Sequence, residues 1–190
     1  MTALTLKSYQ QSALDALATY ARAARVKGPA AAFAEHAGRA YNADAFGPDV
    51  PCVCLRIPTG GGKTVLAAHA VPLLAAEWRG TDAPVAVWLV PSDTIRTQTL
   101  KALQTSGHPY REALEAVYGL GLRVCSLDDV AQVPAPQWGR QAVVIVVATI
   151  QSFRIDDAGQ RNVYSFTEAF EPHFKYALAQ GKGAEGGRDL

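Results

Sequence analysis

The segment of this chain that is best equipped for chemistry runs from Ile57 to Thr64 and reads Ile-Pro-Thr-Gly-Gly-Gly-Lys-Thr. Consecutive glycines allow positive φ and let backbone N–H groups approach a phosphate that side chains would obstruct. Lys63 adds a cation for β and γ phosphates, and Thr64 adds a hydroxyl for Mg²⁺ at a helix start, where anions are favoured. The pattern predicts a phosphate-binding loop for a nucleoside triphosphate. Its expected contacts are Pro58, Thr59, Gly60, Gly61, Gly62, Lys63 and Thr64.

The strict loop pattern begins with glycine, whereas Ile57 stands at that position. The loop nevertheless follows an apolar run at 52–57 and precedes a helical pattern, which is the context that a phosphate loop needs. We expect the run to be a strand with Cys52 and Cys54 as buried thiols on one side. A purely structural turn is the alternative that this context disfavours.

Three runs that are apolar on consecutive residues are expected to form the sheet that positions the loop: 52–57, 85–90 and 142–148. Such runs are typical of parallel strands covered on both faces, and 122–127 is a weaker strand pattern. Ligands of open parallel sheets bind beyond the carboxyl ends of the strands. The loops that follow the three runs, at 58–60, 91–93 and Thr149, are therefore expected to converge on one edge.

Helical patterns lie on both sides of these runs. Apolar spacing predicts a helix over 8–27, with Ser8 as its cap and Gly28-Pro29 as its stop. Further helices are expected at 30–41, 63–78, 94–105 and 166–180; Pro72 is expected to kink or shorten the helix at 63–78, and Pro172 to break the one at 166–180 near its start. The glycine-rich end is expected to be a loop.

The composition fits one soluble globular domain, because 49% of the 190 residues are hydrophobic and 18% are charged. A formal net charge of +1 gives no long-range field, so any binding of a polyanion must be local. The three cysteines lack paired spacing, which disfavours a secreted disulfide framework and a closed zinc site. No apolar stretch is long enough to cross a membrane, so we expect a cytoplasmic protein without a membrane partner.

Residues 58–64 resemble motif I of the superfamily-two helicases, in particular the DEAD/DEAH-like group that includes the restriction subunit of type III restriction enzymes. A residue other than glycine at the position of Ile57 is usual there. The resemblance implies a RecA-like α/β P-loop NTPase domain, with a mainly parallel sheet flanked by helices, here incomplete at the C-terminus. Residues 6–14 resemble the glutamine motif of the family, in which Gln10 matches the residue that reads adenine; taken alone, it is a polar residue near a helix start.

Two further segments resemble motifs that grip nucleic acid in this family. Residues 87–92, together with Gln98, resemble motif Ia, and residues 147–153 resemble the threonine-bearing motif after the next strand. The alternative for the motif Ia segment is a capped helix after a buried strand. Arg96 and Lys101 are further candidates for phosphate contacts, and the alternative for each is a solvated helix face. The nucleic-acid contacts that the resemblance implies are Pro91, Ser92, Thr94, Arg96, Gln98, Thr149 and Gln151.

An ATPase of this superfamily needs an Asp-Glu pair to hold Mg²⁺ and to position water, and no such dipeptide occurs in the chain. Asp128-Asp129 and Asp156-Asp157 are expected to be caps or turn residues. We therefore expect the front portion of a longer motor, which binds ATP and Mg²⁺ without turnover and lacks the second motor domain.

Two other classes remain open at this point. One is a self-contained P-loop kinase or small NTPase that uses Asp128 or Asp129 for Mg²⁺, and the other is a truncated, non-catalytic nucleotide-binding module. DNA is favoured over RNA as the partner, and a methyltransferase or nuclease subunit is left open. The expected division of the chain is a helical segment at 1–50, a partial RecA-like domain at 51–180 and a flexible tail at 181–190.

Overall fold

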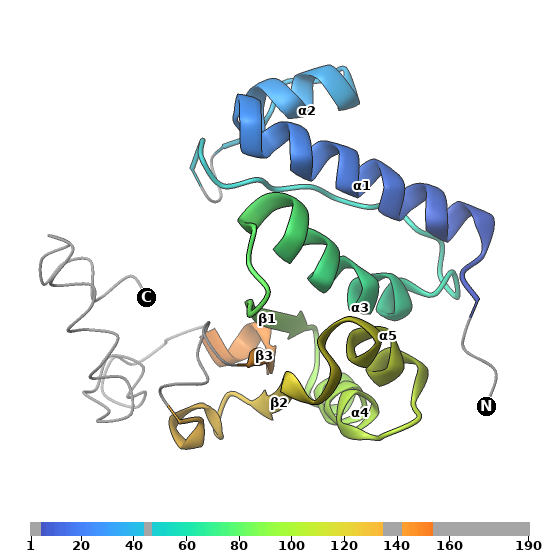
Figure 1. Ribbon diagram of the computed structural model, residues 1–190, viewed down its shortest axis with the longest axis vertical. Coiled ribbons are helices and arrows are strands. Elements are labelled where there is room, and N and C mark those ends of the chain that lie inside the picture. Colours follow the sequence, from blue (N-terminus) through green and yellow to red (C-terminus); the bar gives the residue numbers. More distant parts are fainter. Residues whose placement is uncertain (1–4, 44–46, 135–141, 154–190) are drawn as a thin grey trace, which may run out of the picture. The chain divides into compact units, whose positions relative to one another are not determined.

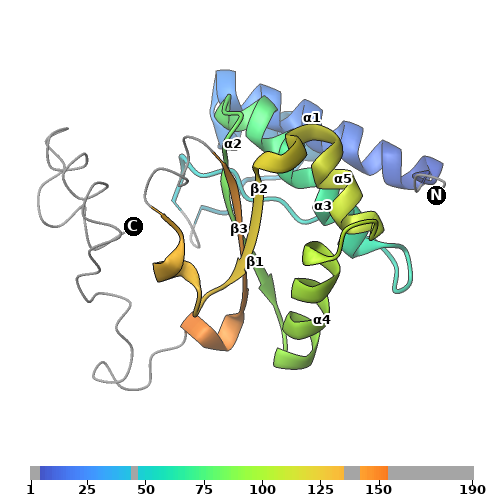
Figure 2. The same ribbon diagram turned by 60° about the horizontal axis from the view of Figure 1, so that its bottom comes forward.

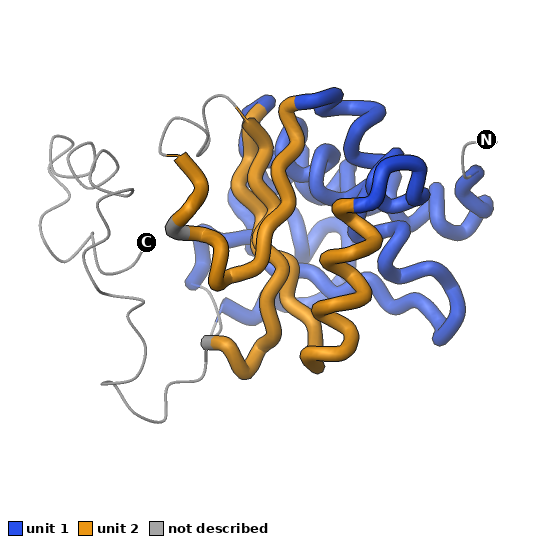
Figure 3. Tube along the Cα trace, turned by 90° about the horizontal axis from the view of Figure 1, so that it is seen from below, with its two compact units in different colours: residues 1–82, 105–120 blue, residues 83–104, 121–190 orange. Residues whose placement is uncertain are grey.

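The computed structural model describes residues 5–43, 47–134 and 142–153. They fall into two compact units, one made of residues 1–82 and 105–120 and the other of residues 83–104 and 121–190 (Figure 3). The expected helix at 166–180 and the expected glycine-rich loop lie outside the described residues. None of the described helices has the length and the apolar character that a membrane span requires.

The first unit is helical, and its longest element is α1 (Ser8–Lys27), which packs against α2 (Pro29–Ala37) and α3 (Lys63–Leu74) (Figure 1). The predicted bounds of α1 are confirmed, but its N-cap is Lys7 and not Ser8. The Gln10 side chain accepts a hydrogen bond from the Lys7 N–H group, which makes the cap. The second helix is shorter than predicted, because Gly38 has a left-handed conformation that ends it.

The α-helix after the phosphate loop includes Pro72 and is shorter than the predicted range 63–78. The α-helix α3 ends at Leu74 and is followed by a π-helix, η1 (Ala75–Arg79), which Gly80 closes with φ +62°. Proline has no N–H group for the carbonyl four residues before it, so α3 lacks one backbone hydrogen bond at Pro72.

One helix of this unit, α5 (Pro109–Tyr118), has no counterpart among the elements expected from the sequence. Pro109 occupies its first turn, where the missing N–H group costs nothing. His108 caps it, because His108 Nδ1 accepts a hydrogen bond from the Tyr110 N–H group at 3.3 Å. The sequence signal was the His-Pro pair ahead of a short apolar pattern.

The second unit contains a parallel sheet of β1 (Val85–Val90), β2 (Leu122–Ser126) and β3 (Val143–Thr149) in the order β1-β3-β2 (Figure 2). The helix α4 (Asp93–Gln104) packs against all three strands. The strand predictions at 85–90, 122–127 and 142–148 are therefore confirmed. β3 lies in the middle, and all of its residues are buried.

The edge strand β1 departs from the expected burial on both faces. Val85, Val87 and Leu89 are 46%, 56% and 50% exposed, although they are in register with buried residues of β3. On the same face, the β2 side of the sheet is covered by a cluster that includes Val133 and Cys125. The expectation of two covered faces is right for β3 and wrong for β1.

The predicted strand at 52–57 is absent, because these residues pair with no strand in the described part of the chain. Cys54 is exposed and Cys52 is half-buried, so the prediction of two buried thiols is also wrong. A run of apolar residues specifies an extended backbone only when a neighbouring strand supplies the hydrogen-bonding ladder. The phosphate loop therefore does not follow a strand of the β1-β3-β2 sheet.

Candidate phosphate loop and polar strand edge

The phosphate loop has the backbone that its glycines were expected to allow. Gly60 and Gly62 have φ of +76° and +79°, and the Gly61 N–H group donates to the Pro58 carbonyl at 3.0 Å. A Cβ atom on Gly61 would lie 2.6 Å from Ile57 Cγ2, so the close turn also needs the middle glycine. Two positive φ angles and one steric contact thus require glycine at all three positions.

Lys63 lies against this loop. Its ammonium group donates to the carbonyl oxygens of Ile57 at 3.1 Å and of Pro58 at 3.0 Å. These acceptors are neutral, and an anionic phosphate oxygen is a stronger partner for the same cation. Thr64 stands in the first turn of α3, where its hydroxyl is a suitable oxygen ligand for Mg²⁺.

The structure brings Gln10 to the phosphate loop, although 51 residues separate it from Gly61. The Gln10 side chain is 7% exposed; its Nε2 donates to the Gly61 carbonyl at 2.9 Å, and its Oε1 accepts from the Lys7 N–H group at 2.9 Å. A Cβ atom on Gly62 would stand 2.5 Å from Gln10 Nε2. The amide therefore occupies space that only a glycine at position 62 leaves open.

Tyr9 also contacts the loop, and the sequence reasoning assigned it no role. Its hydroxyl donates to the Gly61 carbonyl at 3.0 Å. The available signal was the Tyr9-Gln10 pair itself, which reads equally well as an ordinary helix start.

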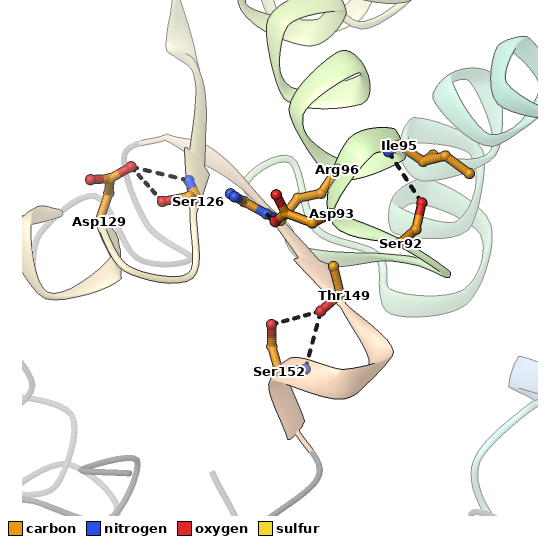
Figure 4. Close-up of polar contacts among 8 residues, drawn as sticks. All are labelled: Ser92, Asp93, Ile95, Arg96, Ser126, Asp129, Thr149 and Ser152. Carbon is orange, nitrogen blue, oxygen red and sulfur yellow. Dashed lines mark hydrogen bonds and ion pairs between the residues drawn. The ribbon is translucent and has the colours of Figure 1, made fainter. Parts of the chain in front are cut away.

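In the second unit, polar groups follow the carboxyl ends of all three parallel strands (Figure 4). After β1, Ser92 Oγ accepts from the Ile95 N–H group at 3.4 Å, and Arg96 Nε lies 2.7 Å from an Asp93 carboxylate oxygen. Ser92 and Thr94 are exposed. Because Asp93 partly neutralises Arg96, the attraction of this guanidinium for an external phosphate is reduced.

The end of β3 carries a comparable turn. Thr149 is 7% exposed, and its Oγ1 lies 2.9 Å from Ser152 Oγ and accepts from the Ser152 N–H group at 3.2 Å. The exposed Gln151 donates to the Pro91 carbonyl at 3.3 Å, which joins this turn to the one after β1. The strand ends at Val90 and Thr149 therefore do converge, as expected from parallel topology. Gln98 is exposed on α4.

Asp129 makes the turn after β2, as expected for a cap residue. Its Oδ2 accepts from Ser126 Oγ at 2.6 Å and from the Ser126 N–H group at 3.4 Å. Ser126 is 6% exposed, so its polar groups depend on a partner within the protein. The carboxylate of Asp129 thus has a structural role in the second unit.

Replacing Asp129 with alanine is expected to lower the free energy of unfolding by about 1–3 kcal/mol, because the buried N–H and hydroxyl groups of Ser126 lose this acceptor. Urea unfolding of the wild type and the variant measures the change. Asp128→Ala is the matched control, since Asp128 is an exposed neighbour on the same turn. Equal losses in the two variants would contradict the assignment of the cap to Asp129.

The helix that begins with the phosphate loop carries a pH-sensitive residue. Burial lowers the pKa of His69 below its ordinary value of 6.5, so the fold favours neutral imidazole. The unfolded chain then binds more protons below pH 6.5, and stability should fall as the pH drops through 6.5 toward the lowered pKa. Urea unfolding at pH 7.5 and 5.5 is expected to show a smaller drop for His69→Gln than for the wild type. Equal drops in the wild type and in His69→Gln would contradict this prediction.

Comparison with known proteins identifies a family. Residues 3–176 match the family described as type III restriction enzyme, res subunit. Comparison with curated proteins and with solved structures finds no match. The matched range includes the phosphate loop, Gln10 and all three strands, and the mixed α/β architecture with a small parallel sheet is consistent with a RecA-like domain. The chain therefore belongs to the family of the type III restriction enzyme res subunit, as an ATP-binding, helicase-like domain of superfamily two.

Proposed function

We propose that this chain is the ATP-binding portion of a DNA-dependent ATPase and that it does not turn ATP over by itself. The observation that carries the proposal is the convergence of Gln10 and Lys63 on the turn at 58–62, each through hydrogen bonds to loop carbonyls. An amide that suits a base and a cation that suits phosphates thus both contact one loop.

The roles of the loop residues follow from their positions. Lys63 exchanges its carbonyl partners for the β and γ phosphates, and the backbone of Pro58 to Gly62 surrounds them. Thr64 would hold Mg²⁺ through its hydroxyl, and the ion would supply positive charge next to the phosphates. Gln10 reads adenine, because each atom of its amide has one hydrogen-bonding valence beyond those used by Lys7 and Gly61.

The polar strand edge supplies the proposed DNA contacts. Ser92 and Thr94 are exposed just after the end of β1, and Gln98 is exposed on α4. Hydroxyl and amide groups of this kind bind phosphates without reading sequence. Pro91, Arg96, Thr149 and Gln151 complete the proposed set. The description of the family as a restriction enzyme subunit supports DNA over RNA, and it supports a nuclease or methyltransferase subunit as a further partner.

The expected lack of turnover rests on the sequence, which contains no Asp-Glu dipeptide. Asp129 is a poor substitute in a self-contained kinase, because its carboxylate already binds Ser126. We assign the RecA-like role to 51–180 and a supporting role to 1–50, with 181–190 as a tail. A cytoplasmic setting agrees with the free thiols of the three cysteines.

Nucleotide titrations of the 190-residue chain test this proposal. The wild type is expected to bind Mg²⁺-ATP more tightly than Mg²⁺-GTP in isothermal titration calorimetry, and single-stranded DNA should change the ATP affinity. Phosphate release should remain at the buffer rate with and without DNA. DNA-stimulated release of phosphate would overturn the claim of no turnover, and transfer of phosphate to a small acceptor would favour the kinase class.

A further inference from the structure

The first turn of α1 is hydrogen-bonded to the phosphate loop at the carbonyl of Gly61. It accepts hydrogen bonds from the Tyr9 hydroxyl at 3.0 Å and from Gln10 Nε2 at 2.9 Å. A carbonyl oxygen has two lone pairs, so these two donors use its full capacity. The two side chains come from adjacent residues of one helix and reach across 52 and 51 residues of sequence.

Holding this carbonyl also sets the direction of a phosphate donor. The peptide bond between Gly61 and Gly62 is trans and planar, so the Gly62 N–H group points opposite to the Gly61 carbonyl. Gly62 is the N-cap of α3, at the end of the helix that favours anions. By holding the Gly61 carbonyl, Tyr9 and Gln10 therefore also orient the Gly62 N–H group, which points to the opposite side of the peptide at the phosphate end of the loop.

We propose that Tyr9 is a positioning residue for triphosphate binding, which acts through the Gly61–Gly62 peptide. This inference rests on the proposed function of the loop. Gln10 is expected to bind adenine as well as the loop. The only polar group of the Tyr9 side chain is its hydroxyl, which already donates to the Gly61 carbonyl. Tyr9 thus holds the peptide independently of which base is bound, and it contributes to phosphate affinity and not to base selection.

A binding experiment distinguishes the role of Tyr9 from that of Gln10. Mg²⁺ complexes of ATP, GTP and inorganic tripolyphosphate are titrated into the wild type and into Tyr9→Phe, which removes the hydroxyl and keeps the ring. Loss of one hydrogen bond is expected to weaken all three ligands by the same factor, about 3- to 10-fold, and to leave the ATP-to-GTP ratio unchanged. Gln10→Ala should lower that ratio.

Tyr41→Phe is the matched control, because the Tyr41 hydroxyl donates to the Val50 carbonyl in the same unit and to no residue of the loop. It should bind all three ligands as the wild type does. A second measurement needs no nucleotide: the backbone amide resonance of Gly62 should shift in Tyr9→Phe and stay in place in Tyr41→Phe.

Two outcomes would overturn the role of Tyr9: wild-type affinity of Tyr9→Phe for tripolyphosphate, or a loss of ATP-to-GTP discrimination in that variant. Failure of the proposed function looks different. In that case the wild type binds none of the three ligands, or Lys63→Ala binds them as well as the wild type does, and this inference falls with it. If Lys63 matters and the Tyr9 hydroxyl does not, the inference about Tyr9 alone is wrong.

Discussion

Replacing Lys63 with alanine is expected to raise the Kd for Mg²⁺-ATP by about 100-fold, which removes binding from the measurable range of most titrations. The variant loses the charge-assisted hydrogen bonds that the ammonium makes with phosphate oxygens. It also loses the bonds to the carbonyls of Ile57 and Pro58, which hold the side chain against the loop. Isothermal titration calorimetry with Mg²⁺-ATP measures the effect directly.

Two further variants test whether the loss of affinity is specific to Lys63 and to its ammonium group. Lys27→Ala removes one positive charge from an exposed lysine of the same unit that pairs with Glu35, and it should bind ATP normally. Lys63→Arg keeps the charge but replaces a compact ammonium with a planar fork, so an intermediate affinity is expected. Since Lys63 is exposed, its loss should leave the unfolding midpoint nearly unchanged. Wild-type ATP affinity in Lys63→Ala would remove the phosphate loop from the proposed function.

Replacing Gly62 with alanine is expected to have the second-largest effect, because it disturbs the loop in two ways. A residue with a side chain rarely adopts φ +79°, and the left-handed conformation costs about 1–2 kcal/mol. The new Cβ would also lie 2.5 Å from Gln10 Nε2 and would push the amide away from the Gly61 carbonyl. Affinity for Mg²⁺-ATP should fall by about 10-fold or more, with a loss of ATP-to-GTP discrimination.

Gly38→Ala separates these two causes. Gly38 has φ +61°, and no atom lies within 4 Å of the position that its Cβ would take. This control therefore carries the backbone strain without the steric contact. Both variants should lose similar stability from strain in urea unfolding, but only Gly62→Ala should lose ATP affinity. Equal ATP binding by the two variants would mean that Gln10 does not need its present contact with the loop.

Several signals that act over a few residues were read correctly from the sequence. The bounds of α1 follow from its apolar spacing and from Gly28, whose φ of +85° ends the helix before Pro29 starts the next. Positive φ at Gly60 and Gly62 follows from the glycine run itself. In each case the physical cause lies within one or two turns of the chain.

Features that depend on distant partners could not be read in this way. The apolar run at 52–57 has the composition of a strand and lacks a partner, whereas the run at 143–149 has partners on both sides. The exposure of Val87 reflects the edge position of β1, which no property of β1 alone reveals. The α5 helix was missed for a different reason, because its apolar pattern is short.

Glycine φ preferences, helix stops and apolar runs are local properties, so the sequence alone predicted the glycine turn at 60–62 and the parallel strands. The family match over residues 3–176 agrees with that reading. The folded chain, by contrast, was needed to show that Tyr9 and Gln10 share the Gly61 carbonyl and that Asp129 accepts hydrogen bonds from Ser126. A hydrogen bond needs two groups at about 3 Å, and the sequence names the groups without placing them at that distance.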